Sequence, residues 1–364
     1  WCNGGGCCGG FWQGNAARMG PSVKVNTMEK SNKLVSKVKG SGGGGCNTTH
    51  GCFEISELER KYPRVQKFIK KNFQWFNTKD TLAWFAERGV ELKKEADGRM
   101  FPVTNDSQTI INCLLQAGDK YGVEIMMQSE VASLESGVEG FMVNTSDSRL
   151  LTPDYVCIAC GGYPKSSMFD WLTKLGHSIE SPVPSLFTFN MPGNKITELM
   201  GISVERAAVK VAGTKLMEDG PLLITHWGMS GPAILRLSAW GARQLAEKNY
   251  HFTILVNWLP DYNEQELRTA WPSFREEYAA QKVVNKNPFG LPGRLWSYLL
   301  SSSDIDSNIR WAEIPSKEQN NLIRNLVTQE FAVNGKTTFK EEFVTCGGIK
   351  LNEIDPNTMQ SKIQ

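Results

Sequence analysis

The first glycine cluster has the spacing of a phosphate-binding loop. Residues 4–9 read Gly-Gly-Gly-Cys-Cys-Gly and match G-x-G-x-x-G. In such a loop, Gly4 makes a tight turn, Gly6 lets a pyrophosphate approach the backbone, and Gly9 lets the following helix pack closely. Glu29 stands about 20 residues further on, at the predicted end of a second strand, where its carboxylate can bond a ribose hydroxyl. Together they favour a dinucleotide site over a glycine-rich frayed terminus.

A second glycine cluster, residues 41–47, reads Ser-Gly-Gly-Gly-Gly-Cys-Asn. Consecutive glycines present a row of backbone N–H groups that can form an anion-binding nest. Lys33, Lys37 and Lys39 stand just upstream and add positive charge. A flexible linker is the alternative, since Gly-Ser composition is typical of linkers. The Cys-Asn pair that ends the run, with no further Gly or Ser, argues against a linker.

Cys157 and Cys160 have C-x-x-C spacing on a predicted strand, residues 155–159, that ends at Gly161 and Gly162. Residues three apart on a strand point to opposite faces, which makes a disulfide between them awkward. The favoured interpretation is therefore a buried strand whose Gly-Gly end lets a ligand approach. A redox pair is the alternative.

His226 lies in residues 225–232, which read Thr-His-Trp-Gly-Met-Ser-Gly-Pro. An imidazole titrates near neutral pH, so His226 is a candidate for acid–base catalysis or substrate contact. Ser230 or Gly231 before Pro232 predicts the N-cap and first residue of a helix. A structural histidine at this strand-to-helix corner is the alternative.

The elements around these motifs follow an α/β pattern. Alternation predicts a strand over 22–29, and an apolar face at helical spacing predicts a helix over 108–121. A strand over 122–127 follows, so this region has the helix–strand alternation that is typical of a parallel sheet. Residues 55–95 are predicted to be mostly helical, and 141–143 to be a further strand.

The predicted secondary structure changes at Pro182-Val-Pro184. From there to about residue 258, short strands and turns predominate, and 262–330 is helical and charged. Residues 337–349 return to strand-like sequence. The sequence shows no fixed-period repeat, which excludes a solenoid or propeller.

Bulk composition excludes several classes of protein. The chain has 364 residues, 40% hydrophobic residues and a net charge of +2, so it lacks the strong positive field of a nucleic-acid-binding protein. Nine irregularly spaced cysteines do not form a secreted disulfide framework and favour a reduced, cytoplasmic location. Cys and His lack paired zinc spacing, and no targeting or membrane-spanning segment is visible. His177 is typical of an ordinary helix end.

Four motifs occur in a fixed order along the chain. They are residues 41–47, Gly-Arg-Met-Phe-Pro at 98–102, residues 225–232 and Val-Thr-Cys-Gly-Gly-Ile at 344–349. Together they resemble the BaiN-like, or aminoacetone-oxidase-like, NAD(P)/FAD-dependent flavoproteins over nearly the whole chain.

The resemblance implies an α/β fold with a three-layer Rossmann-type FAD/NAD(P)-binding domain at 1–186 and 342–364. A β-barrel-like, β-rich domain at 187–260 and a helical domain at 261–341 are expected as an insert. The chain opens with Trp-Cys-Asn before the first glycines, so we expect it to start inside a strand, as in a fragment. It also stops before a glycine-rich segment that completes the flavin site in the family.

The resemblance implies an FAD-dependent oxidoreductase that acts on a small organic substrate, amine-like or other, with NAD(P)H or oxygen as redox partner. No nucleic acid, membrane or metal is expected, the oligomeric state is unassigned, and His226 is the catalytic candidate. The expected cofactor-binding residues are Gly4, Gly6, Gly9, Glu29, Lys37, Ser41, Gly42, Gly43, Gly44, Cys46, Asn47, Val131, Gly161, Gly162, Gly347 and Gly348.

One departure from the family concerns Gly45, which stands where the family usually has an arginine that contacts phosphate or flavin. Two alternatives to the oxidoreductase also stay open, because no strong catalytic base stands out and because the chain starts and stops abruptly. One is a dinucleotide-binding protein without redox turnover, and the other is an inactive fragment that lacks the C-terminal flavin-binding segment.

Overall fold

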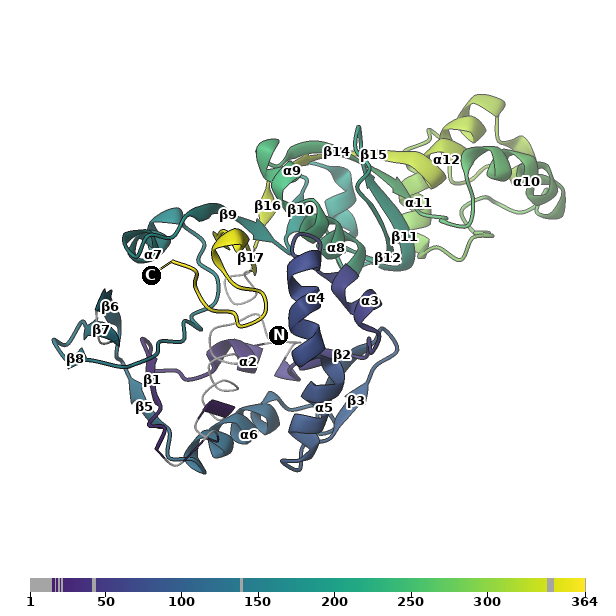
Figure 1. The fold of residues 1–364 in the computed structure, drawn as a ribbon. Helices are drawn as coiled ribbons and strands as arrows, with labels where there is room; N and C mark the ends of the chain where they lie inside the picture. Colours follow the sequence, from purple (N-terminus) through teal and green to yellow (C-terminus); the bar gives the residue numbers. More distant parts are fainter. Residues whose placement is uncertain are drawn as a thin grey trace. The chain divides into compact units, whose positions relative to one another are not determined.

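Two units divide the chain (Figure 1). Unit 1 comprises Trp1–Val183 and Lys340–Gln364, and unit 2 comprises Pro184–Phe339. The computed structural model describes residues 15–16, 18, 20, 22–40, 44–137, 140–338 and 344–363. Each unit is described below by itself.

A parallel pair of strands lies at the centre of the predicted dinucleotide-binding region. β1 (Asn26–Glu29) pairs with β5 (Glu124–Met127), in register from Asn26 opposite Glu124 to Glu29 opposite Met127. α6 (Ser107–Asp119) precedes β5, and the side chain of Asp106 caps its first turn by accepting from the Gln108 N–H. The predicted helix–strand rhythm and parallel pairing are therefore confirmed.

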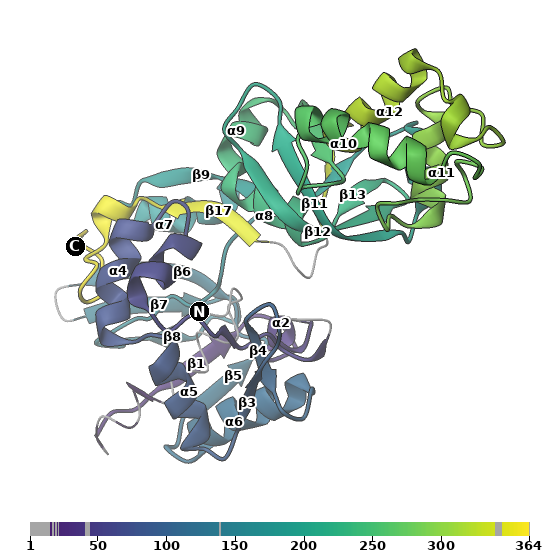
Figure 2. The same cartoon turned by 90° about the vertical axis from the view of Figure 1, so that its right-hand side faces the viewer.

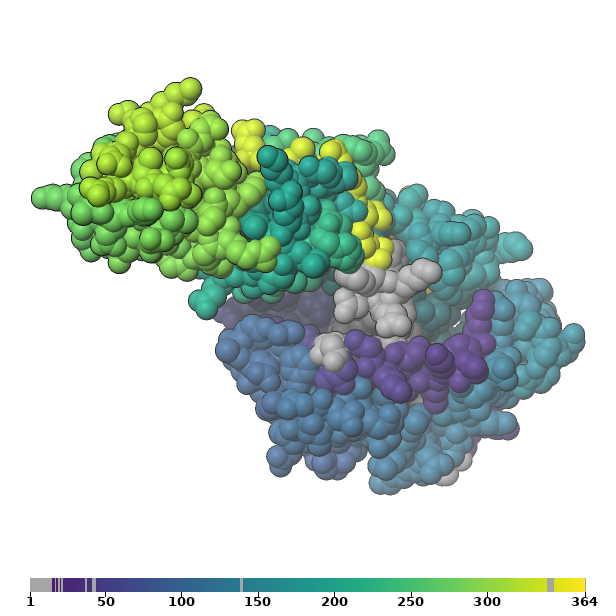
Figure 3. All heavy atoms as spheres, turned by 180° about the vertical axis from the view of Figure 1, so that it is seen from behind, coloured from purple at the N-terminus to yellow at the C-terminus, as the bar shows by residue number. Residues whose placement is uncertain are grey.

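The apolar face of α6 packs against the segment that follows β1. Ile110 and Leu114 are fully buried in one cluster with Val35 and Val38, which flank and belong to α2 (Ser36–Gly40). In Figure 3, the purple N-terminal residues run across the surface of unit 1 beside the blue ones. Burial of this helix face thus holds α2, which precedes the second predicted glycine motif, against α6.

Helices and a small antiparallel sheet fill residues 49–102. The predicted helical region is confirmed, with a capping box at Asn77 that starts the third of its α-helices. The helical elements are α3 (Ile55–Leu58), η2 (Glu59–Lys61), α4 (Gln66–Trp75) and α5 (Thr78–Ala86), and the sheet has the order β2 (Thr49–His50), β4 (Arg99–Pro102), β3 (Leu92–Lys94).

An antiparallel meander follows β5. It consists of β6 (Val131–Gly137), β7 (Gly140–Thr145) and β8 (Leu150–Leu151). β7 contains the strand predicted at 141–143. The strand predicted at 155–159 is wrong, because residues 152–165 form neither helix nor strand. Tyr155 is 80% exposed and Ile158 45% exposed, so this apolar run lacks the buried face that stabilises a strand.

The C-terminal residues return to unit 1. β17 (Val344–Ile349) forms a two-stranded sheet with β9 (Ile179–Ser185), as the strand-like sequence near the C-terminus predicts. The short helices η3 (Ser166–Phe169) and α7 (Asp170–Lys174) precede β9, and η6 (Leu351–Glu353) follows β17.

Unit 2 contains a seven-stranded sheet in the order β15-β14-β11-β12-β13-β10-β16. Each pairing in it is antiparallel. The strands are β10 (Thr188–Asn190), β11 (Ser203–Val211), β12 (Met217–Thr225), β13 (Gly228–Ser230), β14 (His251–Asn257), β15 (Gln329–Asn334) and β16 (Lys336–Thr337).

Helices cover this sheet in two groups. α8 and α9 lie together at one end of unit 2, and α10, α11 and α12 gather at the other (Figure 2). Their bounds, with two 3₁₀ turns, are η4 (Lys195–Leu199), α8 (Pro232–Trp240), α9 (Ala242–Glu247), α10 (Glu264–Glu277), α11 (Gly293–Ser301), η5 (Trp311–Glu313) and α12 (Ser316–Thr328).

One cluster of buried apolar side chains joins the sheet of unit 2 to its helices. Trp258, Trp271, Trp296 and Trp311 are among its largest members. β15 follows the last helix and pairs with β14, so residues after the helical part return to the sheet. The α/β class with an inserted β-rich and helical part is confirmed, while the boundary between those two parts at residue 260 stays a prediction.

Candidate functional site

Glu29 ends β1 at the carboxyl edge of the parallel pair. Its backbone oxygen accepts from the Ser129 N–H at 2.9 Å, which fixes the chain beyond β5 beside it. Its half-buried carboxylate accepts from the Ser31 N–H through Oε1 at 2.8 Å. Oε2 makes no hydrogen bond to any residue that the structure describes. One carboxylate oxygen thus holds the turn, and the other is bonded to none of the described residues.

The same edge continues into the start of the meander. The Lys30 ammonium donates to Glu130 Oε1, which ties the end of β1 to the residue before β6. Val131 follows directly as the first residue of β6 and is 41% exposed. The structure therefore brings Glu29 and Val131, two predicted cofactor contacts, to one edge.

Arg149, in the turn between β7 and β8, stabilises this edge. Its guanidinium donates to Ser129 Oγ at 2.6 Å and pairs with Asp147 at 2.7 Å. Hydrogen bonds from Arg149 and from the Thr145 hydroxyl lower the pKa of Asp147 to about 2. Asp147 therefore stays ionised at neutral pH and holds the guanidinium against the Ser129 turn.

The described part of the second glycine cluster has backbone close to the surface. Gly44 has φ +97°, and a Cβ built there would meet no described residue within 4 Å. Cys46 is fully buried with φ +58°, and its carbonyl accepts from the Thr48 hydroxyl at 3.2 Å. The Asn47 side chain is exposed. Gly44 and Asn47 are thus accessible, whereas Cys46 could meet a ligand only through its backbone.

Gly45 faces an aromatic ring. A Cβ at this position would lie 3.2 Å from Cδ1 of Phe101, so any larger residue here must displace that ring by a few tenths of an ångström.

Several predicted cofactor contacts lie outside the described residues. For one more, Lys37, the structure describes the backbone but not the side chain. Lys37 is part of α2. The contacts outside the described residues are Gly4, Gly6, Gly9, Ser41, Gly42 and Gly43.

Gly161 and Gly162 follow the segment that is not a strand. Gly161 has φ +75°, which favours glycine. A Cβ on Gly162 would lie 2.6 Å from Oγ1 of Thr345 in β17. The close approach at Gly162 is therefore to the C-terminal strand of the chain itself.

Gly347 serves the pairing of β17 with β9. It has φ +140°, and a Cβ there would lie 2.7 Å from the Glu180 carbonyl oxygen and 2.8 Å from that of Ser181. Gly348 has φ +124°, and a Cβ there would lie 3.8 Å from Cε1 of Phe169, an ordinary contact distance. Chain packing thus explains Gly347 without a cofactor.

His226 lies in the turn between β12 and β13, and its side chain is exposed. Its ring lies 3.9 Å from that of Trp227. The Thr225 hydroxyl beside it is buried and has no hydrogen-bond partner among the described residues. The position is compatible with a substrate contact, but the described residues include no carboxylate bonded to the imidazole.

The glycines of the 225–232 motif have structural roles. A Cβ on Gly228 would lie 2.1 Å from the Phe189 carbonyl oxygen, and one on Gly231 would lie 2.9 Å from the Leu223 nitrogen. Gly231 is the N-cap of α8 and Pro232 its first residue, as predicted. The strand-to-helix corner therefore depends on these residues.

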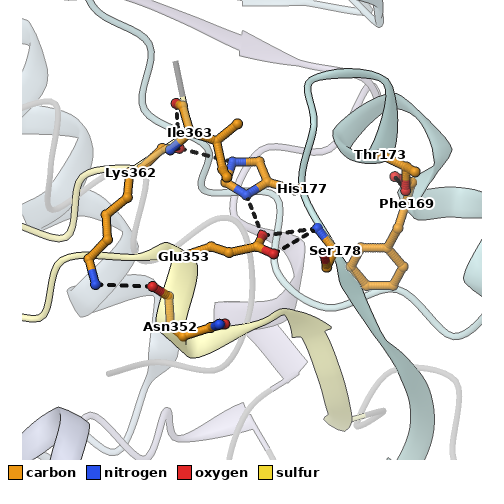
Figure 4. Close-up of polar contacts among 9 residues, drawn as sticks. Phe169, Thr173, His177, Ser178, Asn352, Glu353, Lys362 and Ile363 are labelled. Atoms are coloured by element: carbon orange, nitrogen blue, oxygen red, sulfur yellow. Dashed lines mark hydrogen bonds and ion pairs between the residues drawn. The ribbon is translucent and has the colours of Figure 1, made fainter.

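Sequence reasoning missed a buried cluster around His177 (Figure 4). His177 Nδ1 lies 3.0 Å from Oε2 of Glu353, and Nε2 lies 3.1 Å from the Ser361 hydroxyl. The Ser178 N–H also donates to Glu353 at 2.9 Å. His177 does follow the end of α7, as predicted, and its N–H donates to the Leu172 carbonyl at 3.1 Å, but its ring is 7% exposed and bonded on both nitrogens, which was not predicted. No local signal could reveal partners 176 and 184 residues away.

A basic surface was also missed, although its spacing is visible in the sequence. We call it the basic face. Six exposed cations and no acidic residue lie between residues 60 and 71, around the start of α4, and Trp75 at the end of α4 is 75% exposed. Glu59, just before them, is buried and lies 3.4 Å from Lys70. The basic face consists of Arg60, Lys61, Arg64, Lys67, Lys70 and Lys71.

Two other kinds of site are absent from the described residues. No helix in the described ranges has both the length and the apolar character needed to cross a membrane. The same ranges contain no group of three or more His, Cys, Asp or Glu residues placed to hold a metal ion.

Comparison with curated proteins shows distant relatives over almost the whole chain. A 3-dehydro-bile acid delta(4,6)-reductase of Clostridium scindens is 23% identical, with 95% of this chain and 85% of the relative aligned. A protein of Haemophilus influenzae named ribosomal RNA dihydrouridine synthase is 25% identical over 98% of this chain and 87% of its own length. A protein of the same name from Escherichia coli is 25% identical over 99% of this chain and 87% of its own length.

Solved structures match with low scores. A point variant of quinol fumarate reductase FrdA of E. coli aligns with a TM-score of 0.41 and 13% identity over 76% of this chain and 56% of its own. Glycine oxidase of Geobacillus kaustophilus aligns with a TM-score of 0.29 and 12% identity over 52% of this chain and 61% of its own.

A family model described as "HI0933-like protein Rossmann domain" matches residues 3–364. The match spans both units and all four motifs of the predicted BaiN-like resemblance, and the bile-acid reductase falls among the relatives. The chain therefore belongs to the HI0933-like Rossmann-domain family.

Proposed function

We propose that this chain is an FAD-dependent oxidoreductase that transfers a hydride or electrons between the flavin and a small organic substrate. NAD(P)H or oxygen would be its redox partner. The observation that carries the proposal is the Glu29 carboxylate at the carboxyl edge of the parallel β1–β5 pair. Ligands of open α/β sheets bind outside this edge, and an acidic residue there bonds the ribose of a dinucleotide. Family membership and the reductase relative support it.

The described residues fit the adenosine end of FAD. Glu29 Oε2 makes no hydrogen bond to described residues and could accept one from a ribose hydroxyl. The backbone at Val131 would meet the adenine, and the backbone at Gly44 is open to a ligand. Further proposed contacts are Gly4, Gly6 and Gly9 to the pyrophosphate, with Lys37, Ser41, Gly42, Gly43, Cys46, Asn47, Gly161, Gly162, Gly347 and Gly348 along the rest of the cofactor.

Bound FAD would supply the redox chemistry, and the chain would supply position and electrostatics. Glu29 would bind and orient the adenosine. His226 is proposed as the residue that moves a proton or contacts substrate. Its exposed ring is reachable, and an imidazole can serve as acid or base at neutral pH.

Glu29→Gln tests the cofactor site. A hydrogen bond to a charged group contributes about 1.5–3 kcal/mol, so the variant should bind FAD about ten- to a hundredfold more weakly. Calorimetric titration with FAD measures this. Glu135→Gln is the matched control, because it removes an exposed carboxylate of unit 1, on β6, that the site does not use. Equal FAD affinity in wild type and Glu29→Gln would contradict the site.

Redox turnover needs a separate measurement. Flavin bound to the wild-type protein should lose its visible absorbance when NADPH or NADH is added without air, or when an amine substrate is added. Flavin that stays oxidised with all three would leave a dinucleotide-binding protein without turnover as the better description.

An RNA substrate is the second candidate, and the basic face favours it. Two relatives are named for ribosomal RNA. The expectation of no nucleic-acid partner rested on the overall charge of +2, whereas the basic face concentrates six cations beside an exposed Trp75. Cations of this kind bind phosphates, and an exposed aromatic ring can stack on an unpaired base.

Charge reversal tests this candidate. The triple variant Lys67→Glu, Lys70→Glu, Lys71→Glu should weaken binding of a ribosomal RNA fragment at least tenfold. It should also flatten the dependence of log affinity on log salt by about 0.7 per lost phosphate contact on a single strand. The control reverses three exposed lysines of unit 2, namely Lys210, Lys248 and Lys317. Equal losses in both variants would indicate nonspecific attraction and contradict the RNA surface.

A further inference from the structure

A hydroxyl, an imidazole and a carboxylate follow one another in a row in unit 1 (Figure 4). Ser361 Oγ lies 3.1 Å from His177 Nε2, and His177 Nδ1 lies 3.0 Å from Glu353 Oε2. A serine within hydrogen-bond reach of a histidine, which a carboxylate orients through the other ring nitrogen, is the arrangement of an activated nucleophile. Geometry defines this arrangement, so the distance of His177 from the other two residues along the chain does not count against it.

Glu353 determines which imidazole nitrogen carries the proton. Its Oε2 accepts from the Ser178 N–H at 2.9 Å, and hydrogen bonds from Ser178 and His177 lower the pKa of Glu353. The carboxyl is therefore ionised at neutral pH and can only accept hydrogen bonds. In a neutral His177 the proton then lies on Nδ1, which leaves the lone pair of Nε2 to accept the proton of the Ser361 hydroxyl.

Exposure differs along the row in the way that a nucleophile and its base require. The side chains of His177 and Glu353 are 7% and 12% exposed, whereas Ser361 is exposed. Burial strengthens the hydrogen bond between His177 and Glu353 because the surroundings are less polar than water. The His177 N–H also donates to the Leu172 carbonyl at 3.1 Å, which fixes the backbone of the base. The base is thus held in place, and the serine lies at the surface where a dissolved reagent arrives.

The backbone after Glu353 holds Ser361 against the ring. The Lys362 N–H donates to the Glu353 carbonyl at 2.8 Å, and the Ile363 N–H donates to Ser361 Oγ at 3.0 Å. The Ile363 carbonyl oxygen lies 2.9 Å from the same Oγ, so the hydroxyl proton has two acceptors and reaches His177 Nε2 by rotation about the Cβ–Oγ bond. The Ile363 N–H would also stabilise negative charge that develops on Oγ.

We propose that Ser361 is a nucleophile that His177 activates, with Glu353 as the positioning residue, and that it reacts with small esters. Oγ attacks the carbonyl carbon of the ester while Nε2 takes the hydroxyl proton. The bond to the leaving oxygen then breaks, and the imidazolium gives its proton to that oxygen, which departs as an alcohol. Water attacks the acyl-serine by the same route, releases the carboxylic acid and restores Ser361. This site is independent of the flavin proposal.

The bonds already made by the neighbouring N–H groups indicate the class of ester. The Lys362 N–H is bonded to the Glu353 carbonyl and the Ile363 N–H to Ser361 Oγ. Neither is therefore directed at the carbonyl oxygen of a substrate, where donors stabilise the charge of the intermediate. An ester whose leaving group is itself a weak base, such as an aryl acetate, depends least on that help and is the expected substrate.

A fluorophosphonate probe tests the nucleophile directly on the full chain. Attack by an activated serine forms an O–P bond and releases fluoride, so the adduct stays on the protein. Trypsin cleavage after Lys350 and Lys362 yields residues 351–362, in which Ser361 is the only serine. We expect mass spectrometry to find the probe on this peptide of the wild-type protein, and we expect the protein to hydrolyse 4-nitrophenyl acetate faster than buffer does.

Variants separate activation from simple exposure. Ser361→Ala should abolish labelling of the peptide. His177→Gln should slow labelling about a hundredfold or more, because a general base contributes about 10²–10⁴-fold. Ser167→Ala removes another exposed serine of unit 1, in η3, and should label at the wild-type rate. Melting temperatures of all variants show whether each is folded at the assay temperature.

Two results would overturn the proposal. One is a folded wild-type protein whose 351–362 peptide stays unlabelled at a probe concentration that labels a serine protease in the same buffer. The other is labelling of Ser361 at the same rate in wild type and His177→Gln, since that would show a serine that the imidazole does not activate. FAD is absent from both measurements, so neither result bears on the flavin site.

Discussion

Glu353 shows how one carboxylate ties the end of the described chain to unit 1. It contacts the His177 ring at 3.0 Å and the Ser178 N–H at 2.9 Å, and Ser361 contacts the other ring nitrogen at 3.1 Å. The hydrogen bonds from Ser178 and His177 lower the pKa of Glu353. An ionised Glu353 therefore stabilises the attachment of the C-terminal residues.

The pH dependence follows from the sign of that shift. A carboxylate with a lowered pKa in the folded state adds stability above its unfolded pKa of about 4.3, and this stability is lost as the pH falls through the folded value. Glu353→Gln should lower the melting temperature at pH 7, and the difference from wild type should shrink below about pH 4.

Thermal unfolding at several pH values measures this difference. Glu135→Gln, which changes an exposed carboxylate on β6, is the control and should follow the wild type throughout. A difference between Glu353→Gln and wild type that persists unchanged at low pH would show that shape, and not charge, is what Glu353 contributes.

At the scale of elements, glycines let strands approach each other where a side chain would not fit. In β17, Gly347 faces the backbone of Glu180 and Ser181, and in β13, Gly228 faces that of Phe189. The neighbours are backbone atoms, which cannot swing aside as a flexible side chain can. These glycines therefore determine which strands pair.

Gly347→Ala should destabilise the β9–β17 pair. The positive φ alone costs of order 1–3 kcal/mol, and contact with two carbonyl oxygens adds to it, so we expect a loss of about 3 kcal/mol or more. Gly89→Ala is the control, because Gly89 has φ +74° but open space around a Cβ. It should cost about 1–2 kcal/mol.

Hydrogen exchange read by mass spectrometry resolves this effect by segment. Peptides from residues 179–185 and 344–349 should exchange faster in Gly347→Ala than in the control. Equal exchange in both variants would show that the strands can move apart at little cost.

At the scale of the whole molecule, the two units differ in how the chain builds them. Unit 2 is one continuous stretch, Pro184–Phe339, with its own buried cluster that includes four tryptophans. Unit 1 combines two distant stretches, and its C-terminal part adds β17 and the contacts of Glu353. A continuous unit with its own core should fold without the rest.

We expect residues 184–339, produced alone, to fold cooperatively with a stability of about 5–15 kcal/mol. The stacked pair Trp296–Trp311, with ring centroids 6.2 Å apart, should give a near-ultraviolet circular dichroism signal that disappears in a single thermal transition. A broad transition without that signal would mean that the core of unit 2 depends on unit 1.

Prediction from the sequence succeeded where the signal is local. The helix before β5, the parallel strand after it, and the Gly231-Pro232 start of α8 follow from apolar periodicity and capping residues within a few positions. The strand predicted at 155–159 failed because an apolar run of that length becomes a strand only when a neighbour covers it.

Local sequence by itself determined the family motifs, the helix–strand rhythm of unit 1 and the position of Glu29 at a strand end, because each depends on residue types at fixed short spacing. Only the tertiary structure decided that Glu29 lies beside Val131, that His177 is bonded to Glu353, and that Cys157 and Cys160 are exposed. These facts depend on packing between segments that are distant in the chain. No residue pattern within one segment encodes which distant surface will cover it.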